Sequence, residues 1–532
     1  MSSPEPPPAP EASLTARPKR IGSNIAFSGL GRAWSAILLF VTIPIVVHGV
    51  GTSAYGIFTL ASVILGYVAF LDFGLTASVV RSVSKHNAVG DRAALERTVG
   101  TAFTLLIGLG VIGAAVIVLV APLVIDSLLH VPQSLKPDAR FALQVAGVGF
   151  GVNMVLVVFA GVVQGMQRLD VFAVRSVVLS TLTSASQIGA VLLGGGLRAL
   201  VLATMAVSVL GFVIFLGASR RLLPGVSFRP RFDRAAVREL AGFGLFRFIN
   251  QASGQVTTQF DPIVIGIFQP IAAVGYYSVP LQLTQKFHVV SDSVTSAYFP
   301  AAVEIHSRGD QVRMRALYIA AVKLVAVAMI FLIVVSVGYA GPIMTVWVGS
   351  SIASMAAPSF TILAIGYGLS ALIGVPAQAS DATGHQRWTA GFAVASALLQ
   401  LSLALILVPR YGPIGAAYAV VINTVTQGFL FVLVVQYRFL HVSLLRTFID
   451  AFLRPLLAGA GLVVLVLLTR NHAHSTPTLV ASLLGAGVLY GALTLTVRVW
   501  SAREIHLVNE MTGGVWSRLP LPALPRWLDA RR

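Results

Sequence analysis

The sequence contains no cysteine and few charged residues. Because none of its 532 residues is cysteine, disulfide bonds, thiolate metal sites and cysteine nucleophiles are all excluded. Only 11% of the residues are charged, 56% are hydrophobic, and the mean hydropathy is +0.86. Soluble domains contain about 25% charged and about 45–50% apolar residues. The composition therefore excludes an ordinary soluble domain and predicts a polytopic membrane protein.

The N-terminus lacks the apolar run of a signal peptide. The first 20 residues, "MSSPEPPPAPEASLTARPKR", are polar and rich in proline. Such a composition favours a disordered tail over a cleaved leader. We expect residues 1–20 to form a cytoplasmic tail.

Long apolar runs occupy most of the remaining sequence. A transmembrane helix needs about 20 apolar residues to cross a hydrocarbon core of ~30 Å. The runs are longer and more continuous than the alternating segments of about 10 residues in a membrane β-barrel, so we expect an all-α protein. About fourteen spans are predicted, at residues 22–48, 52–80, 98–125, 140–163, 172–194, 198–219, 240–266, 274–303, 314–345, 356–380, 388–408, 412–436, 451–469 and 477–499.

Lysine and arginine are distributed unevenly between alternate loops. If the N-terminus is cytoplasmic, the outer loops hold only Lys136, Arg140, Arg198, Arg410 and Arg470, and the other loop and tail cations lie inside. Because positive residues accumulate on the cytoplasmic side, both termini are predicted to be cytoplasmic. The net charge of +18 then reflects loops that face anionic lipid headgroups and does not indicate nucleic-acid binding.

The two halves of the sequence repeat each other at an offset of 219 residues. "GD" at Gly90 recurs at Gly309, and "GMQR" at residues 165–168 recurs as "GHQR" at 384–387. With six spans each, both halves enter the membrane in the same direction, as in alternating-access transporters that bind substrate between the halves near the midplane. The predicted organisation is a tail (1–20), an N-lobe (21–219), a cytoplasmic linker (220–239), a C-lobe (240–436), two further helices (437–499) and a basic cytoplasmic tail (500–532).

Polar side chains follow one face of the seventh predicted span. The stretch "RFINQASGQVTTQFDP" places on this face Arg247, Gln251, Gln255, Thr258 and Asp261. Polar groups are poorly tolerated against lipid, so the face must contact other helices or a water-filled cavity. Hydrogen bonding between helices explains an isolated amide, whereas the full stripe favours a cavity wall.

The eighth predicted span carries a second polar face. Gln285, His288 and Asp292 share this face, and Lys286 lies beside it. Three other spans each carry an isolated charge, namely Arg32, Asp72 and Lys323.

Four of these charges together predict an anion site. Arg32, Arg247, Lys286 and Lys323 fall near mid-membrane depth and come from both halves. A phosphate or pyrophosphate headgroup needs strong N–H donors in a low-dielectric pocket, which arginine and lysine supply. We therefore expect the four cations to bind an anionic substrate headgroup.

Three aspartates complete the intramembrane charges. Asp72, Asp261 and Asp292 are candidates to hold a coupling proton or sodium ion, or to balance the field of the cations. The alternative for a single residue is a structural ion pair, such as Arg32 with Asp72 or Lys286 with Asp292.

Several longer stretches resemble one known family. They are "FDPIVIGIFQPIAAVGYYSVPLQL", "FLDFGLTASVVRSVSKH", "YAGPIMTVWVG", "ATGHQRW" and "LVPRYGPIGAAYAVVI". Over nearly all of residues 20–440, the chain resembles the polysaccharide transporters, or O-antigen type oligosaccharide flippases, of the multidrug/oligosaccharidyl-lipid/polysaccharide exporter superfamily.

This resemblance implies a MATE-like fold with two six-helix lobes in a V shape. It also implies that a polyprenyl-diphosphate-linked oligosaccharide moves from the cytoplasmic to the outer leaflet of a bacterial inner membrane, with its diphosphate-sugar in a cationic central cavity. The expected partners are this lipid-linked substrate, membrane lipids and the polysaccharide polymerase machinery. A multidrug exporter and a lipid II flippase of the same superfamily are the alternatives, and the excess of cations disfavours the first.

No enzyme motif accompanies these features. The sequence shows neither a metal-ligand cluster, nor a carboxylate pair at catalytic spacing, nor a nucleophile motif. A membrane polymerase or ligase would also need a larger outer loop than those predicted. We therefore expect a transporter without catalysis, metal or cofactor.

Overall fold

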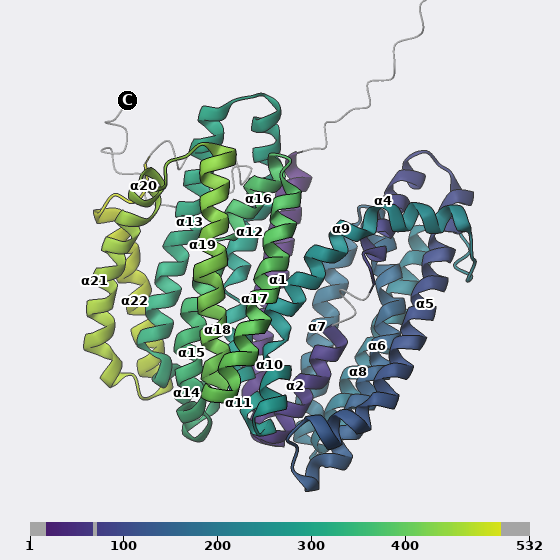
Figure 1. Ribbon diagram of the computed structural model, residues 1–532, viewed down its shortest axis with the longest axis horizontal. Coiled ribbons are helices and arrows are strands. Elements are labelled where there is room, and N and C mark those ends of the chain that lie inside the picture. Colours follow the sequence, from purple (N-terminus) through teal and green to yellow (C-terminus); the bar gives the residue numbers. More distant parts are fainter. Residues whose placement is uncertain (1–17, 67–71, 502–532) are drawn as a thin grey trace, which may run out of the picture.

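The computed structural model describes residues 18–66 and 72–501 and is shown in Figure 1. Within these ranges every regular element is a helix, and the β-type pairing is limited to an isolated bridge between His130 and Pro270. Ten helical segments of the described chain are long and apolar enough to cross a membrane. The all-α prediction is confirmed, and the chain is a multi-pass membrane protein.

The N-lobe is the purple and blue part of Figure 1. Its helices are α1 (Pro18–Val50), α2 (Thr52–Gly66), α4 (Leu75–Ala88), α5 (Arg92–Leu123), α6 (Lys136–Gly165), α7 (Leu169–Leu192) and α8 (Gly196–Leu222). Helix α6 packs against α5 and α8, while α7 packs against α1. A Cβ on Gly110 of α5 would lie 3.1 Å from the carbonyl oxygen of Gly151 on α6, so small residues allow these helices to approach closely.

The C-lobe, teal to green in Figure 1, follows the same plan. Its helices are α9 (Arg234–Gln259), α10 (Asp261–Phe268), α11 (Ile271–Gln285), α12 (His288–Ser307), α13 (Gln311–Gly338), α14 (Ala340–Val348), α15 (Ser350–Ala371), α16 (Gly374–Ala382), α17 (Gln386–Tyr411), α18 (Pro413–Asn423) and α19 (Phe429–Val434). The chain continues through α20 (Leu444–Thr447), α21 (Arg454–Thr469) and α22 (Thr476–Thr496). Helices α21 and α22 pack on α13 at the outer side of this lobe.

Several predicted spans are broken into two helices. Helix α9 ends at Gln259 and α10 begins at Asp261, with Pro262 in its first turn. Proline has no N–H group and cannot continue the preceding helix, but it fits the first turn of a new one. A second break separates α11 from α12. Broken helices are tolerated at membrane depth only where the protein or a cavity covers the backbone.

The two lobes diverge toward one end and meet at the other (Figure 1). At the joined end, α2 packs against α11. A Cβ on Gly56 would lie 2.4 Å from the Ile271 carbonyl oxygen, and a Cβ on Gly275 would lie 2.3 Å from the Thr52 carbonyl oxygen. Gly56 and Gly275 are 219 residues apart, so the repeat places equivalent glycines on either side of this crossing.

The repeat is also visible in the turns that precede α5 and α13. Gly90 and Gly309 have φ angles of 71° and 70°, a region that favours glycine. The next residues, Asp91 and Asp310, each cap the following helix by accepting a backbone N–H at 2.9 Å. The "GD" match therefore corresponds to the same capping turn in both lobes.

The second matching motif differs between the lobes. In "GMQR" the left-handed residue is Gln167, with a φ of 56°, whereas in "GHQR" it is Gly384, with a φ of 83°. The two turns are therefore displaced by two residues relative to the matching letters. The offset of 219 is a local relation and does not hold along the whole lobe.

Candidate functional site

A cavity of about 500 Å³ lies between the lobes. We call it the interlobe cavity; its walls are α1, α2 and α7 of the N-lobe and the segment from α9 to α11 of the C-lobe. The polar residues in its lining include Ser35, Thr42, Tyr55, Thr183, Gln187 and Gln282. Both lobes therefore contribute polar as well as apolar side chains to one chamber.

A direct contact between the lobes borders the interlobe cavity at the joined end. Gln282 Nε2 donates to Tyr55 OH at 2.7 Å, and both residues line the cavity. Nearby, Ser278 is fully buried and also lines the cavity, and its Oγ has no hydrogen-bond partner among the described residues. Buried hydroxyl groups are normally hydrogen-bonded, so the unpartnered Oγ of Ser278 is an exception within this wall.

A second cavity, of about 340 Å³, lies within the C-lobe. We call it the C-lobe cavity; it is lined from α9, α12, α15, α17 and α18. Its polar residues include Thr258, His288, Asp292, Gln400 and Asn423. The two cavities are therefore chemically different, because the C-lobe cavity contains a carboxylate and an imidazole.

A buried carboxylate lies behind the C-lobe cavity. Asp261 is only 1% exposed, and its two oxygens accept hydrogen bonds from Tyr277 OH at 2.7 Å and from Gln400 Nε2 at 2.9 Å. Gln400 lines the cavity, and its Oε1 has no partner in the described part of the chain. Asp261 was predicted from the sequence, whereas Tyr277 and Gln400 were not. The available signal was that Gln400 is an amide inside an apolar run, "ALLQLSLA".

The predicted cations do not share one described cluster. Lys286 is half-buried at the break between α11 and α12, between Gln285 of the interlobe cavity and His288 of the C-lobe cavity. Its Nζ has no carboxylate within salt-bridge distance among the described side chains. Lys323 is buried and donates to the Val499 carbonyl oxygen at 3.3 Å. The structure thus places Lys286 beside the cavities and Lys323 in the lining of neither.

Two predicted site residues lie outside the described side chains. The backbone of Arg32 belongs to α1 and that of Arg247 to α9. Their predicted role as ligands of an anionic headgroup remains a prediction.

The predicted polar stripe divides between helix contacts and cavity lining. Gln255 Nε2 donates to the Gly66 carbonyl oxygen at 2.9 Å and so joins α9 to α2. Thr258 lines the C-lobe cavity, whereas Gln251 is half-buried and lines neither cavity. Both interpretations of the stripe thus apply, each to different residues.

The polar face of the eighth span is divided in a similar way. Gln285 lines the interlobe cavity and donates to the Thr258 carbonyl oxygen at 3.1 Å. His288 lines the C-lobe cavity, where its ring meets the edge of Tyr367 and its Nε2 lies 3.4 Å from Ser370 Oγ. These residues connect the walls of the two cavities.

The other two candidate aspartates have different surroundings. Asp72 is 4% exposed and accepts the backbone N–H groups of Gly74 at 2.9 Å and Thr76 at 3.3 Å. These bonds satisfy its carboxylate at the start of α4 and explain its burial without a bound ion. Asp292 is exposed and lines the C-lobe cavity, and the salt bridges of the described chain do not pair it with Lys286.

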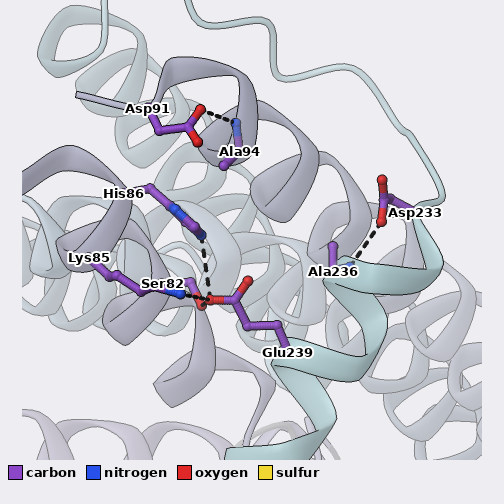
Figure 2. A network of polar contacts seen from close by, with 8 residues as sticks. All are labelled: Ser82, Lys85, His86, Asp91, Ala94, Asp233, Ala236 and Glu239. Carbon is purple, nitrogen blue, oxygen red and sulfur yellow. Dashed lines mark hydrogen bonds and ion pairs between the residues drawn. The ribbon is translucent and has the colours of Figure 1, made fainter. Parts of the chain in front are cut away.

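A polar clamp that was not predicted from the sequence joins the lobes at the diverging end. Figure 2 shows Glu239 of α9 facing α4. Its Oε1 accepts a hydrogen bond from Ser82 Oγ at 3.2 Å and lies 3.4 Å from both Lys85 Nζ and His86 Nε2. Ser78 Oγ also donates to the Leu240 carbonyl oxygen at 2.7 Å. Since α9 then packs on α17, one helix is held by both lobes.

The sequence has relatives among membrane proteins of bacteria. It is 20% identical over 409 residues to the "Putative O-antigen transporter" of Shigella flexneri, covering 76% of this chain and 96% of that protein. It is 26% identical over 333 residues to the "Uncharacterized membrane protein EpsK" of Bacillus subtilis (strain 168), covering 59% of this chain and 62% of that protein.

Solved structures share the fold. The inward closed conformation of the lipid II flippase MurJ matches with a TM-score of 0.70 and 15% identity, covering 89% of this chain and 99% of that one. An inward-facing multidrug resistance MATE family transporter of the MOP superfamily matches with a TM-score of 0.64 and 15% identity, covering 77% and 98%. The predicted MATE-like fold is confirmed.

A family model also matches the chain directly. The model described as "Polysaccharide biosynthesis protein" matches residues 21–306, which is more than half of the sequence. The resemblance seen in the sequence is thereby confirmed, and the chain belongs to the polysaccharide biosynthesis protein family.

Proposed function

We propose that this protein moves a polyprenyl-diphosphate-linked oligosaccharide from the cytoplasmic to the outer leaflet of a bacterial inner membrane. The observation that carries this proposal is the interlobe cavity, which both lobes line and which α2 and α11 border at the joined end. A chamber with polar side chains between two repeated lobes suits a hydrophilic headgroup that must cross an apolar layer by alternating access. The family membership and the named O-antigen transporter support the class of substrate.

In this proposal the diverging end faces the cytoplasm. The turn from α4 to α5 and the start of α9 lie at that end (Figure 1). The adjoining segments are rich in arginine, with Arg92, Arg97, Arg229, Arg231 and Arg234. Positive residues accumulate on the cytoplasmic side, and both termini are cytoplasmic in this proposal. The polysaccharide polymerase machinery would then receive the substrate at the joined end.

Lys286 is the first candidate to bind the diphosphate. It lies between residues that line the two cavities, and its ammonium group has no carboxylate partner in the described chain. An unpaired cation at this depth is expensive unless a mobile anion or water compensates it. Arg32, one helical turn before Ser35 in α1, and Arg247 in α9 are the further candidates.

The C-lobe cavity is the candidate site for a coupling proton or sodium ion. Asp292 is exposed to this cavity, and Asp261 lies behind its wall with Gln400 between. Carboxylate and amide oxygens are ligands for hard cations and acceptors for protons. Asp72 is less suited, because backbone N–H groups already satisfy it.

The test is flipping of a fluorescent polyprenyl-diphosphate oligosaccharide in proteoliposomes. We expect Lys286→Ala to slow flipping about 10-fold or more, because it removes a charge-assisted contact worth about 1.5–3 kcal/mol. Arg410→Ala, which removes an exposed cation at the end of α17, is the matched control and should flip at the normal rate. Asp292→Asn should flip without responding to an imposed proton or sodium gradient.

Two outcomes would contradict the proposal. If the unaltered protein moves a cationic dye against an ion gradient but no lipid-linked sugar, it is a multidrug exporter. If it flips lipid II but not other polyprenyl-diphosphate sugars, it belongs with the lipid II flippases in function as well as in fold.

A further inference from the structure

A groove of about 300 Å³ runs along the first turns of α17. Its described lining consists of Arg387, Trp388, Gly391, Phe392 and Ala395. These residues follow one another at intervals of three or four, so they share one face of the helix. Arg387, Trp388 and Gly391 are exposed, and the groove is therefore open to the surface. We call it the α17 groove.

The α17 groove begins at the cytoplasmic boundary of the membrane in the orientation proposed above. The far end of α17 lies at the joined end, because Gln269, just before α11, donates through Nε2 to the Val408 carbonyl oxygen at 3.3 Å. The start of α17 therefore lies at the diverging end, where Trp388 is the first residue of a predicted span. Tryptophan is favoured at membrane interfaces, and arginine on their cytoplasmic side.

Ring contacts bring a second arginine to the head of the groove. The Arg438 guanidinium lies 5.3 Å from the centre of the Trp388 ring, a cation–π contact. The Trp388 ring packs edge-on against Phe439 at 6.2 Å between centroids, and Phe439 stacks on His385 at 3.8 Å. These contacts fix the tryptophan between α17 and the segment that follows α19. Arg387 and Arg438 therefore lie on neighbouring elements beside one fixed ring.

Neither arginine has an anionic partner in the described chain. Arg387 and Arg438 are exposed and form no salt bridge with a described residue. In contrast, Arg308 pairs with Glu304 at a nearby cytoplasmic turn. A guanidinium group binds phosphate through two parallel N–H···O bonds. The head of the groove is therefore complementary to a phosphate group.

The remainder of the groove is apolar. Gly391, Phe392 and Ala395 continue from Trp388 toward mid-membrane, and Ala395 lies about 12 Å along the helix axis from Arg387, at about 1.5 Å per residue. Gly391 leaves the groove open, since an added Cβ there would meet no atom within 4 Å. A cationic head followed by an apolar channel matches an amphipathic anion whose chain lies along the helix.

We propose that the α17 groove binds an anionic phospholipid of the cytoplasmic leaflet. Arg387 and Arg438 bind the headgroup phosphate, and one acyl chain lies along Trp388, Gly391 and Phe392. The occupant is a phospholipid and not the transported lipid, because the groove shares no described lining residue with the interlobe cavity. Phe392 also lines the C-lobe cavity, so the bound lipid packs against one wall of the candidate coupling-ion site.

The experiment follows the quenching of Trp388 fluorescence by lipids with brominated acyl chains. The full chain in detergent is titrated with brominated phosphatidylglycerol or phosphatidylcholine, and Trp388→Phe identifies the part of the quenching that comes from this ring. We expect phosphatidylglycerol to reach half-maximal quenching at about 10-fold lower concentration, because its phosphate is not neutralised by a cation of its own.

A charge variant tests the head of the groove. Arg387→Gln combined with Arg438→Gln should make the two lipids quench at equal concentrations. The matched control is Arg220→Gln combined with Arg221→Gln, which removes two exposed arginines from the last turn of α8. The control should keep the preference for phosphatidylglycerol.

A shape variant tests the apolar part without changing charge. Gly391→Leu fills the channel and should raise the half-maximal concentration of both lipids at least 3-fold, as estimated for loss of about one favourable contact. Gly217→Leu is its control, because Gly217 is also exposed and an added Cβ there meets no atom within 4 Å. It should leave both titrations unchanged.

Competitors distinguish the sources of the phosphate. Glycerol 3-phosphate should not displace phosphatidylglycerol, and if it does so at the lipid's own concentration, the groove is a site for free phosphate. If a polyprenyl diphosphate displaces the phospholipid at 10-fold lower concentration, the groove belongs to the substrate path. Equal affinity for both phospholipids, or a preference that survives loss of both arginines, would also refute the inference. None of these results bears on flipping, which tests the proposed function separately.

Discussion

At the scale of single residues, two glycines determine how closely the lobes meet. Gly56 and Gly275 occupy equivalent places in the two lobes, and each faces a backbone carbonyl of the other lobe. A side chain there would meet backbone, which cannot rotate away as a flexible side chain can. The neighbouring hydrogen bond from Gln282 to Tyr55 depends on this close approach.

We predict that Gly275→Ala destabilises the protein. Its added Cβ would lie 2.3 Å from the Thr52 carbonyl oxygen, so α2 and α11 must separate, and overpacking of this kind costs about 1–3 kcal/mol. Gly217→Ala in α8 is the matched control, because a Cβ there meets no atom within 4 Å. The thermal unfolding midpoint in detergent should fall for Gly275→Ala and stay equal or rise for Gly217→Ala. Equal midpoints for both variants would show that the lobes do not touch here.

At the scale of elements, α9 is shared between the lobes. The linker before it is bound to α5, since Thr104 Oγ1 donates to the Arg231 carbonyl oxygen at 2.8 Å and Ser227 N donates to Glu96 Oε1 at 2.9 Å. The clamp at Glu239 attaches the first turns to α4, and the remainder packs on α17. A rearrangement of the lobes must therefore bend α9 or release the clamp.

We predict that the clamp weakens in acid. Partial burial raises the pKa of Glu239, but the hydrogen bond from Ser82 and the charges of His86 and Lys85 outweigh it and hold the pKa below its ordinary value. A carboxyl with a lowered pKa stabilises the clamped state fully above its ordinary pKa, and the contribution disappears as the pH falls through the lowered value. The clamp should therefore be intact at neutral pH and lost only at a pH below the ordinary glutamate range.

Spin labels on Asn87→Cys and Arg238→Cys provide the measurement. We expect a narrow distance distribution at neutral pH that broadens in Glu239→Gln and, at low pH, in the unaltered clamp. Glu304→Gln is the control, since it breaks a pair with Arg308 in which both side chains are more than 60% exposed, and exposed pairs contribute little. A distribution that Glu239→Gln leaves unchanged at neutral pH would refute the clamp.

At the scale of the whole molecule, the structure is a two-lobed protein closed at one end. The joined end combines the α2–α11 crossing with a backbone bridge in which Ile271 N donates to the His130 carbonyl oxygen at 3.2 Å. At the diverging end, α9 and its linker join the lobes. The interlobe cavity should therefore be reached from the diverging end in this conformation.

The absence of cysteine allows this to be tested directly. We predict that Thr183→Cys, in the wall of the interlobe cavity, reacts with a membrane-impermeant maleimide in inside-out vesicles. It should not react in spheroplasts, in which only the outer face of the membrane is accessible. Ser127→Cys, exposed in the π-helical segment Val124–Leu128 at the joined end, should react only from outside, and Ser307→Cys only in inside-out vesicles. Labelling of Thr183→Cys from outside would show that either the proposed membrane orientation or the assignment of the closed end is wrong.

Much of the fold could be predicted from the sequence, and less of the site. The apolar runs, the "GD" caps and the resemblance motifs are local patterns, so they led to the helices, the two lobes and the family. The site depended on pairs distant in sequence, such as Asp261 with Gln400 or Glu239 with Ser82. Such pairs form only when two helices have particular rotations about their axes, which no local pattern specifies.

The sequence by itself determined that this is an all-α membrane protein of two repeated lobes, because hydrophobic run length, charge alternation and repeat offset are properties of the chain alone. Only the tertiary structure decided which polar residues share a cavity. It made Asp72 an acceptor for backbone N–H groups at the start of α4, placed Lys323 against the Val499 carbonyl oxygen, and gathered hydroxyl groups from α1, α2 and α7 around one chamber. The physical reason is that successive helical residues differ by about 100° in direction, so the packing of neighbouring helices determines which face meets lipid, protein or water.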